Sequence, residues 1–144
     1  MPEGINKMIF GMFLFLAALQ DGKSKTIHVW LLVAAALAGG ILCFISGSFS
    51  YDRILSCFIG ILIVFLSRMT HGAIGAGDGW FFTVSGLFLS SLMNLSLLVY
   101  GVFLSGFFCG GIYFCCRIRG TDVRKVSVPF LPFLVPVWIG LVIL

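Results

Sequence analysis

The stretch between Gly79 and Arg117 carries no charged side chain, and this is the strongest constraint on how the chain can fold. One membrane-spanning helix needs about 20 apolar residues, so this stretch is too long for a single span. Over all 144 residues, 60% are hydrophobic and 10% are charged, with a mean hydropathy of +1.18. Soluble domains have about 25% charged residues. We therefore expect an integral membrane protein whose single domain covers residues 1–144.

Six apolar segments are expected to form transmembrane helices, which makes the predicted fold all-α. We divide the long uncharged stretch near Ser90, Ser91 and Asn94, because these polar residues favour a loop. In the fifth segment, Gly106 and Gly110 have the spacing of small residues at close helix contacts, which we expect within the molecule. The predicted segments are approximately Gly4–Gln20, Ile27–Ser46, Tyr51–Ser67, Trp80–Leu92, Leu95–Cys116 and Val126–Leu144.

The basic residues indicate how the predicted helices are oriented. Seven of the nine Lys and Arg residues fall in the first, third and fifth loops, whereas Lys7 and Arg53 lie on the opposite face. Because cytoplasmic loops carry an excess of Lys and Arg, we expect the odd-numbered loops in the cytoplasm and both termini outside. Basic side chains at the ends of spans bind anionic lipid headgroups, so the net charge of +4 requires no nucleic-acid partner.

Two of the five acidic residues are predicted to reach the same membrane boundary. Asp21 follows the first segment and Asp78 precedes the fourth, and the two segments between them return the chain to the cytoplasmic side. Asp52 is predicted on the outer face, and Asp122 lies in a basic loop where a solvated carboxylate is expected. Two close carboxylates cannot both ionise easily, so one keeps a proton while the other can take one from water. We predict that Asp21 and Asp78 form a catalytic pair of the aspartic protease type, which needs no metal and no cofactor.

Glycines surround Asp78 in the sequence GAIGAGDGWF, where they occupy positions 72, 75, 77 and 79. Residues without side chains would let an extended substrate backbone approach the carboxylate closely. We therefore predict that Gly75, Gly77 and Gly79 give access to the substrate, together with Trp80, which follows them directly.

Other interpretations of these aspartates remain open on spacing alone. Asp78 could cap the N-terminus of the following helix, and Asp21 could pair with Lys23 or Lys25. Ionisable residues in membrane proteins also relay protons and ions, so a small proton-coupled transporter is an alternative. The lack of a carboxylate in the middle of any predicted segment disfavours it. A catalytically silent assembly factor is a further alternative.

The motif Gly75-Ala76-Gly77-Asp78 has the form GxGD, and the chain resembles the GxGD aspartyl proteases of the membrane, most closely the type IV prepilin peptidases. The stretch from Asp21 to Ile27 is similar to the pattern around the first aspartate of that family. The stretch from Val126 to Phe133 resembles the proline-containing segment before its last helix. Two positions depart from the pattern, since His28 stands where proline is common and Trp80 where lysine is common.

The resemblance implies an intramembrane aspartic endopeptidase with Asp21 and Asp78 as its catalytic residues. Its substrate would be a type IV prepilin or pseudopilin, whose short basic leader stays in the cytoplasm and is removed at the boundary of the inner (cytoplasmic) membrane. The chain has no CxxC pair, so it is similar to short members without an N-terminal methylation domain, such as the peptidases of tight-adherence (Flp) pilus systems. No methyltransferase activity is expected. Tyr51-Asp52 resembles the Tyr-Asp motif of presenilin-type proteases, but it is predicted on the wrong face.

Overall fold

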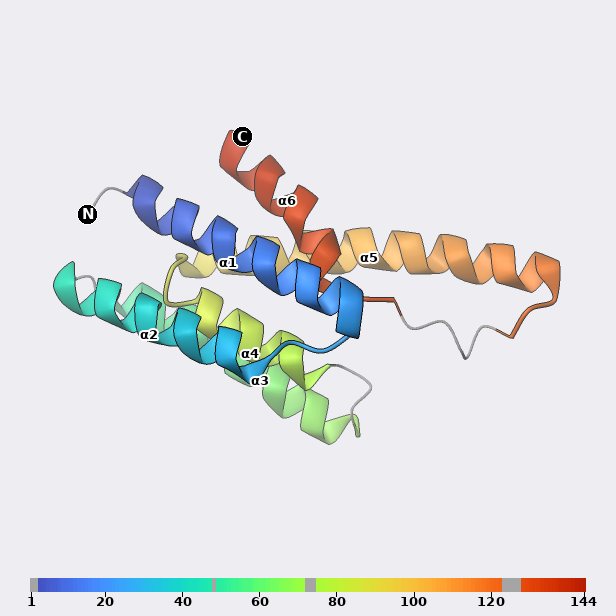
Figure 1. Cartoon of the computed structure of the whole chain (residues 1–144), viewed down its shortest axis with the longest axis horizontal. Coiled ribbons are helices and arrows are strands. Elements are labelled where there is room, and N and C mark those ends of the chain that lie inside the picture. The colour runs from blue at the N-terminus through green and yellow to red at the C-terminus, as the bar shows by residue number, and fades with distance from the viewer. Residues whose placement is uncertain (1–2, 48, 72–74, 123–127) are drawn as a thin grey trace.

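The computed structural model describes residues 3–47, 49–71, 75–122 and 128–144, and in these residues it contains six α-helices and no strand (Figure 1). The predicted all-α fold is therefore confirmed for the described part of the chain. The helices are α1 (Glu3–Ser24), α2 (Val29–Ile45), α3 (Tyr51–Met69), α4 (Ala76–Ser85), α5 (Ser91–Arg119) and α6 (Leu131–Ile143).

Two helix boundaries differ from the prediction in a way that matters for the aspartates. The first helix continues beyond Gln20 to Ser24, so Asp21 lies inside its last turns. The fourth helix begins at Ala76 instead of Trp80, so Asp78 lies in its first turn. Both carboxylates are thus attached to regular helix and not to the flanking loops. The predicted start of the sixth segment at Val126 lies outside the described residues, and α6 begins at Leu131.

The break in the long uncharged stretch falls at residues 86–90, and Ser90 is the residue before α5. The prediction that Asn94 helps to form a loop is wrong, because Asn94 is a fully buried residue of α5. Its side-chain amide donates hydrogen bonds to the carbonyl oxygens of Ser56 (3.1 Å) and Phe82 (3.2 Å), and its Oδ1 accepts one from the Ser85 hydroxyl (2.7 Å). A buried amide is stable when its polar atoms are bonded in this way. Asn94 therefore joins α3, α4 and α5.

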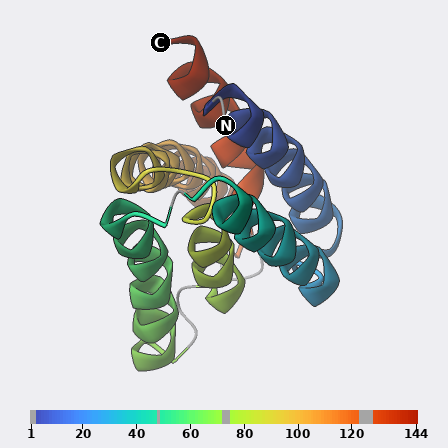
Figure 2. The ribbon, with the colours of Figure 1, turned by 90° about the vertical axis from the view of Figure 1, so that its left-hand side faces the viewer.

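The short helix α4 packs against α3 through glycines at three levels. A side chain at Gly60 of α3 would overlap the backbone of Thr83. One at Gly79 would come within 2.7 Å of the backbone nitrogen of Val64, and one at Gly86 within 2.5 Å of that of Cys57. In the end-on view of Figure 2, α4 lies between α2 and α3. The absence of side chains thus allows two helix backbones to touch.

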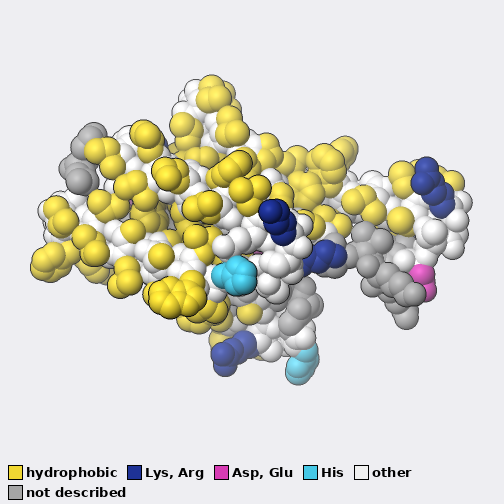
Figure 3. Space-filling view, viewed as in Figure 1, with side chains coloured by type: hydrophobic (Ala, Val, Ile, Leu, Met, Phe, Trp, Pro, Cys, Tyr) yellow, Lys and Arg dark blue, Asp and Glu magenta, His cyan; other side chains and the backbone are white. Residues whose placement is uncertain are grey.

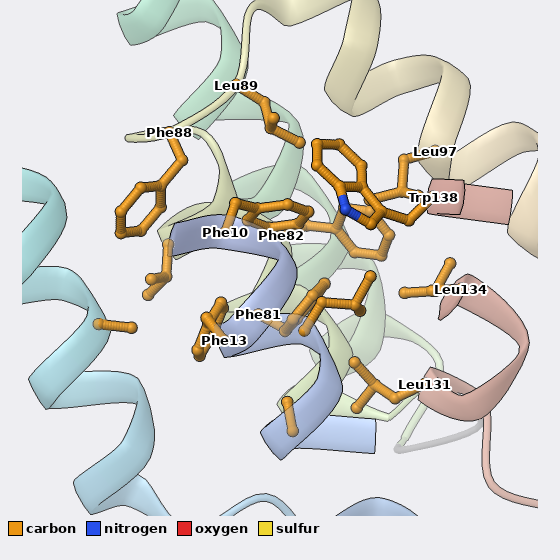
Figure 4. Close-up of a cluster of buried hydrophobic side chains, with 14 of the residues drawn as sticks. Phe10, Phe13, Phe81, Phe82, Phe88, Leu89, Leu97, Leu131, Leu134 and Trp138 are labelled. Carbon is orange, nitrogen blue, oxygen red and sulfur yellow. The ribbon is translucent and has the colours of Figure 1, made fainter. Parts of the chain in front are cut away.

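A cluster of aromatic side chains connects α4 to the first and last helices (Figure 4). Phe13 of α1 stacks on Phe81 of α4 with ring centres 5.2 Å apart. Phe10 of α1 meets Trp138 of α6 edge to face at 4.7 Å. Such pairs add about 0.5–1.5 kcal/mol each beyond the effect of burying their area. This cluster makes α1 and α4 neighbours, which is the condition for their aspartates to meet.

The outer surface of the bundle is largely apolar (Figure 3). Phe44 and Trp30 of α2 and Phe107 of α5 are more than four-fifths exposed. Contiguous exposed apolar surface of this kind marks contact with a membrane or with another protein. Among the helices in the described residues, α5 alone is both long and apolar enough to cross a membrane, while α2 and α6 are apolar but shorter. These features point to a membrane protein.

The C-terminal half of α5 extends beyond the other helices (Figure 1). An added side chain at Gly106 or at Gly110 would meet no atom within 4 Å. The expectation that these glycines pack inside the molecule is therefore wrong: Phe108 of α5 contacts Phe133 of α6 with ring centres 5.2 Å apart, but no described atom lies against Gly106 or Gly110 themselves.

We expect Gly60→Ala to lower the free energy of unfolding by about 3 kcal/mol or more, the upper end of the usual cost of overpacking, since the obstructing atoms belong to the Thr83 backbone. Gly106→Ala is the matched control, because the same methyl group enters open space and alanine favours a helix by about 1 kcal/mol. Thermal unfolding of both purified variants measures the difference. Equal melting temperatures would contradict the packing of α4 on α3.

Candidate active site

Asp21 is a buried carboxylate that joins the end of α1 to the start of α6. Only 7% of its surface is exposed. The backbone N–H of Leu131, the first residue of α6, donates a hydrogen bond of 3.0 Å to Asp21 Oδ2. The first N–H groups of a helix lack partners within the helix and carry a partial positive charge, so a carboxylate at this point is stabilised. The two residues are 110 positions apart in the chain.

The turn after α1 holds the next segment beside this carboxylate. The N–H of Lys25 donates to the carbonyl oxygen of Asp21 (2.9 Å), and Lys25 has a positive φ of 55°. The N–H of His28 donates to Oε1 of Gln20 (3.2 Å). These bonds reverse the chain tightly before α2, so that Thr26 and Ile27 line the same cavity as Asp21.

Asp78 enters from α4, where the residue before the helix is Gly75. The N–H of Asp78 donates to the carbonyl oxygen of Gly75 (3.1 Å) and begins the helix. Because Gly75 occupies the N-cap position, the alternative that Asp78 is the N-cap is wrong. A side chain at Gly75 would come within 2.9 Å of Asp78 Oδ2. Glycine at this position therefore leaves room for the carboxylate.

The environment raises the pKa of Asp78 to about 6. Burial of the carboxyl group is the larger cause, and the negative charge of Asp21 is the second. Asp78 itself lies outside the predicted transmembrane segment, which starts two residues later at Trp80. The structure thus brings together the two aspartates that the sequence analysis selected, and they interact electrostatically.

Both aspartates line one cavity of about 620 Å³, which we call the aspartate cavity. Gly75 and Gly77 also line it. Gly79 is buried against Val64 of α3, and Trp80, which is 52% exposed, lines a different hollow beside α2. Gly72 lies outside the described residues.

The other two aspartates considered above are separate from this cavity. Asp52 lies at the opposite end of the bundle, where its carboxylate accepts hydrogen bonds from the N–H and hydroxyl groups of Ser91 at the start of α5. This agrees with the interpretation that Tyr51-Asp52 is not part of the site. Asp122 follows α5 and is exposed.

The sequence was compared with known protein families, curated proteins and solved structures. The sequence model of the type IV leader peptidase family matches residues 8–115, which include Asp21, Asp78 and the GxGD motif. The chain belongs to the type IV leader peptidase family. This confirms the resemblance to prepilin peptidases and supports a leader peptidase function in general. No curated protein and no solved structure was found to match the chain.

Metal-binding side chains do not gather at the site, since the described residues contain no group of three or more His, Cys, Asp or Glu placed to hold a metal ion. The polar side chains that line the aspartate cavity are those of Asp21, Lys25, Thr26 and Asp78.

One contributor to the site was missed in the sequence analysis. Leu131 orients Asp21 through its backbone N–H, a group that no residue pattern reveals directly. The available signal was Pro132, because proline favours the first turn of a helix and so predicts a helix start at this point. Phe130, which lines the aspartate cavity, directly precedes this helix start.

We expect Asp78→Asn to stabilise the protein at pH 8 by up to about 3 kcal/mol, with a gain that disappears toward pH 4. The folded protein binds the Asp78 proton more tightly than the unfolded chain, so the stability of the native protein falls as pH rises from about 4 to about 6. Asparagine does not ionise, so Asp78→Asn removes the free-energy cost of a charged carboxylate at this buried position. Melting temperatures of both proteins across this range measure the effect.

Asp122→Asn is the control for this experiment, because Asp122 is exposed and its substitution should produce no such pH-dependent difference. A difference between Asp78→Asn and the native protein that stays constant from pH 4 to pH 8 would refute the raised pKa.

Proposed function

We propose that this protein is an intramembrane aspartic endopeptidase that removes the basic leader peptide of type IV prepilins or pseudopilins. The observation that carries the proposal is the shared cavity of Asp21 and Asp78, in a chain of the leader peptidase family. The two carboxyl groups differ in their surroundings, as the two partners of an acid–base pair must. Asp21 accepts a backbone N–H at a helix start, whereas Asp78 has a raised pKa and favours its protonated form more than an ordinary aspartate does.

In the proposed reaction, the Asp21 carboxylate takes a proton from water while the water oxygen bonds to the carbonyl carbon of the scissile peptide. Protonated Asp78 donates its proton to the carbonyl oxygen, so the intermediate is a neutral diol. Asp21 then returns its proton to the amide nitrogen as the C–N bond breaks, and a hydroxyl proton of the diol goes back to Asp78. Each carboxyl group ends in its starting state, and the two products are a carboxylic acid and an amine.

We further propose that the helices cross the inner (cytoplasmic) membrane as six spans with both termini outside, so that the aspartate cavity faces the cytoplasm. The distribution of basic residues supports this orientation. Helices such as α4, with ten residues, are too short to cross a bilayer unaided and would rely on neighbouring helices to shield them. The proposal covers peptidase activity alone, since the chain has no CxxC pair.

Asp21→Asn and Asp78→Asn should each abolish cleavage of a co-expressed prepilin, because neither amide can take up or supply the required proton. Cleavage is measured by the change in prepilin mass, and the amount of each variant in the membrane fraction is measured in parallel. Asp52→Asn is the matched control and should leave cleavage intact. Full cleavage by either active-site variant would refute the proposal, and aspartate-dependent ion flux without peptidase activity would favour the transporter.

Gly75→Ala should reduce kcat by about tenfold or more, because its methyl group displaces the Asp78 carboxylate by contact with Oδ2. Gly106→Ala is the control, since its methyl group enters open space and Gly106 does not line the aspartate cavity. Single-turnover cleavage rates and melting temperatures distinguish loss of geometry from loss of folding. Equal rates for the two variants would show that Asp78 does not depend on the space at Gly75.

A further inference from the structure

A second hollow meets the aspartate cavity at Asp78. It has a volume of about 400 Å³ and lies between α3, α4 and α5. Gly75, Asp78 and Phe130 line both spaces. A polypeptide that passes from one space to the other would therefore pass the carboxyl group of Asp78. We call the second hollow the α3–α5 groove.

The walls of the α3–α5 groove are apolar. Its lining residues on α3 are Ile63 and Leu66, and those on α5 are Leu98, Val102 and Ser105. The Ser105 hydroxyl donates to the carbonyl oxygen of Val102 in its own helix (3.1 Å). Among the described residues, Asp78 at its end is the only charged one that lines the groove. The groove would therefore accept an apolar peptide and exclude a charged one.

The groove is open along the axis of α5. Leu66 on one wall is 41% exposed, and Val102 on the other is 53% exposed. From Leu98 to Ser105 the α5 wall covers eight residues, which span about 10 Å along the helix axis at a rise of 1.5 Å per residue. This length accommodates about two turns of a helix or three extended residues.

We propose that the α3–α5 groove binds the first residues of the substrate's apolar segment, directly beyond the scissile bond. This inference rests on the proposed function and adds the substrate-binding surface. The basic leader would lie in the aspartate cavity, where Asp21 and Thr26 contribute polar groups. The polar walls of the aspartate cavity give way to the apolar walls of the groove at Asp78. A substrate with a polar leader followed by an apolar segment would therefore bind with the junction between the two beside the Asp78 carboxyl group.

Another apolar groove, between α2 and α4, provides a matched comparison. It has a volume of about 440 Å³ and includes Val33 and Trp80. None of its lining residues also lines the aspartate cavity. A peptide bound there would not be led to Asp78, so we assign the apolar segment to the α3–α5 groove.

The test compares two substrates, a full-length prepilin and a peptide that ends a few residues after the cleavage site. Val102→Trp fills the α3–α5 groove, and Val33→Trp places the same side chain in the α2–α4 groove, from a position that is 44% exposed. For Val102→Trp we expect the ratio of kcat/KM for prepilin to that for the peptide to fall by about tenfold, which corresponds to about 1.4 kcal/mol of lost binding. Val33→Trp should leave the ratio unchanged.

A photo-crosslinking amino acid at position 102 or 33 gives a second measurement that does not depend on the tryptophan variants folding. We expect full-length prepilin to be captured from position 102. Capture from position 33 alone, or an unchanged ratio in Val102→Trp, would overturn the assignment of the groove. A native protein that cleaves neither substrate would instead overturn the proposed function.

Discussion

The contact between the backbones of α3 and α4 is the constraint on which the site depends. The helix α4 has ten residues and carries Asp78 in its first turn, so its position decides where that carboxyl group lies. A side chain added at Gly60, Gly79 or Gly86 would collide with the backbone of the facing helix. Close packing against α3 holds α4 in place although α4 is short. Glycine in this protein therefore serves the architecture as well as the candidate active site.

The two aspartates are held by different means. Asp21 is bonded to the first N–H of α6, which couples the last helix to the first. Asp78 has space made for it by Gly75, and burial together with the charge of Asp21 raises its pKa to about 6. The aromatic cluster beneath them, in which Phe13 stacks on Phe81, keeps α1 and α4 side by side. The difference between the carboxyl groups thus arises from their surroundings, because the side chains themselves are identical.

The apolar exterior and the long helix α5 agree with the membrane setting of the family. Beyond Ser105, which lines the α3–α5 groove, α5 continues to Arg119 for about 21 Å at 1.5 Å per residue. This part of the helix, with exposed Phe107 and Phe114, presents apolar side chains to its surroundings. An apolar surface that adjoins the groove in this way is consistent with the proposed binding of an apolar substrate segment there.

The all-α fold class, the approximate helices and the two aspartates that share a cavity could all be predicted from the sequence. Long uncharged, apolar segments predict membrane helices without any knowledge of tertiary contacts. The order of these helices and the loops between them then predicts which carboxylates lie at the same end of the bundle. Three features depend on how the helices pack and could not be predicted: Asn94 is buried in α5, Gly79 packs against Val64, and the Leu131 N–H binds Asp21. A local pattern reports what one segment prefers alone, whereas a hydrogen bond across 110 positions or a contact between two backbones exists only when distant segments fold together.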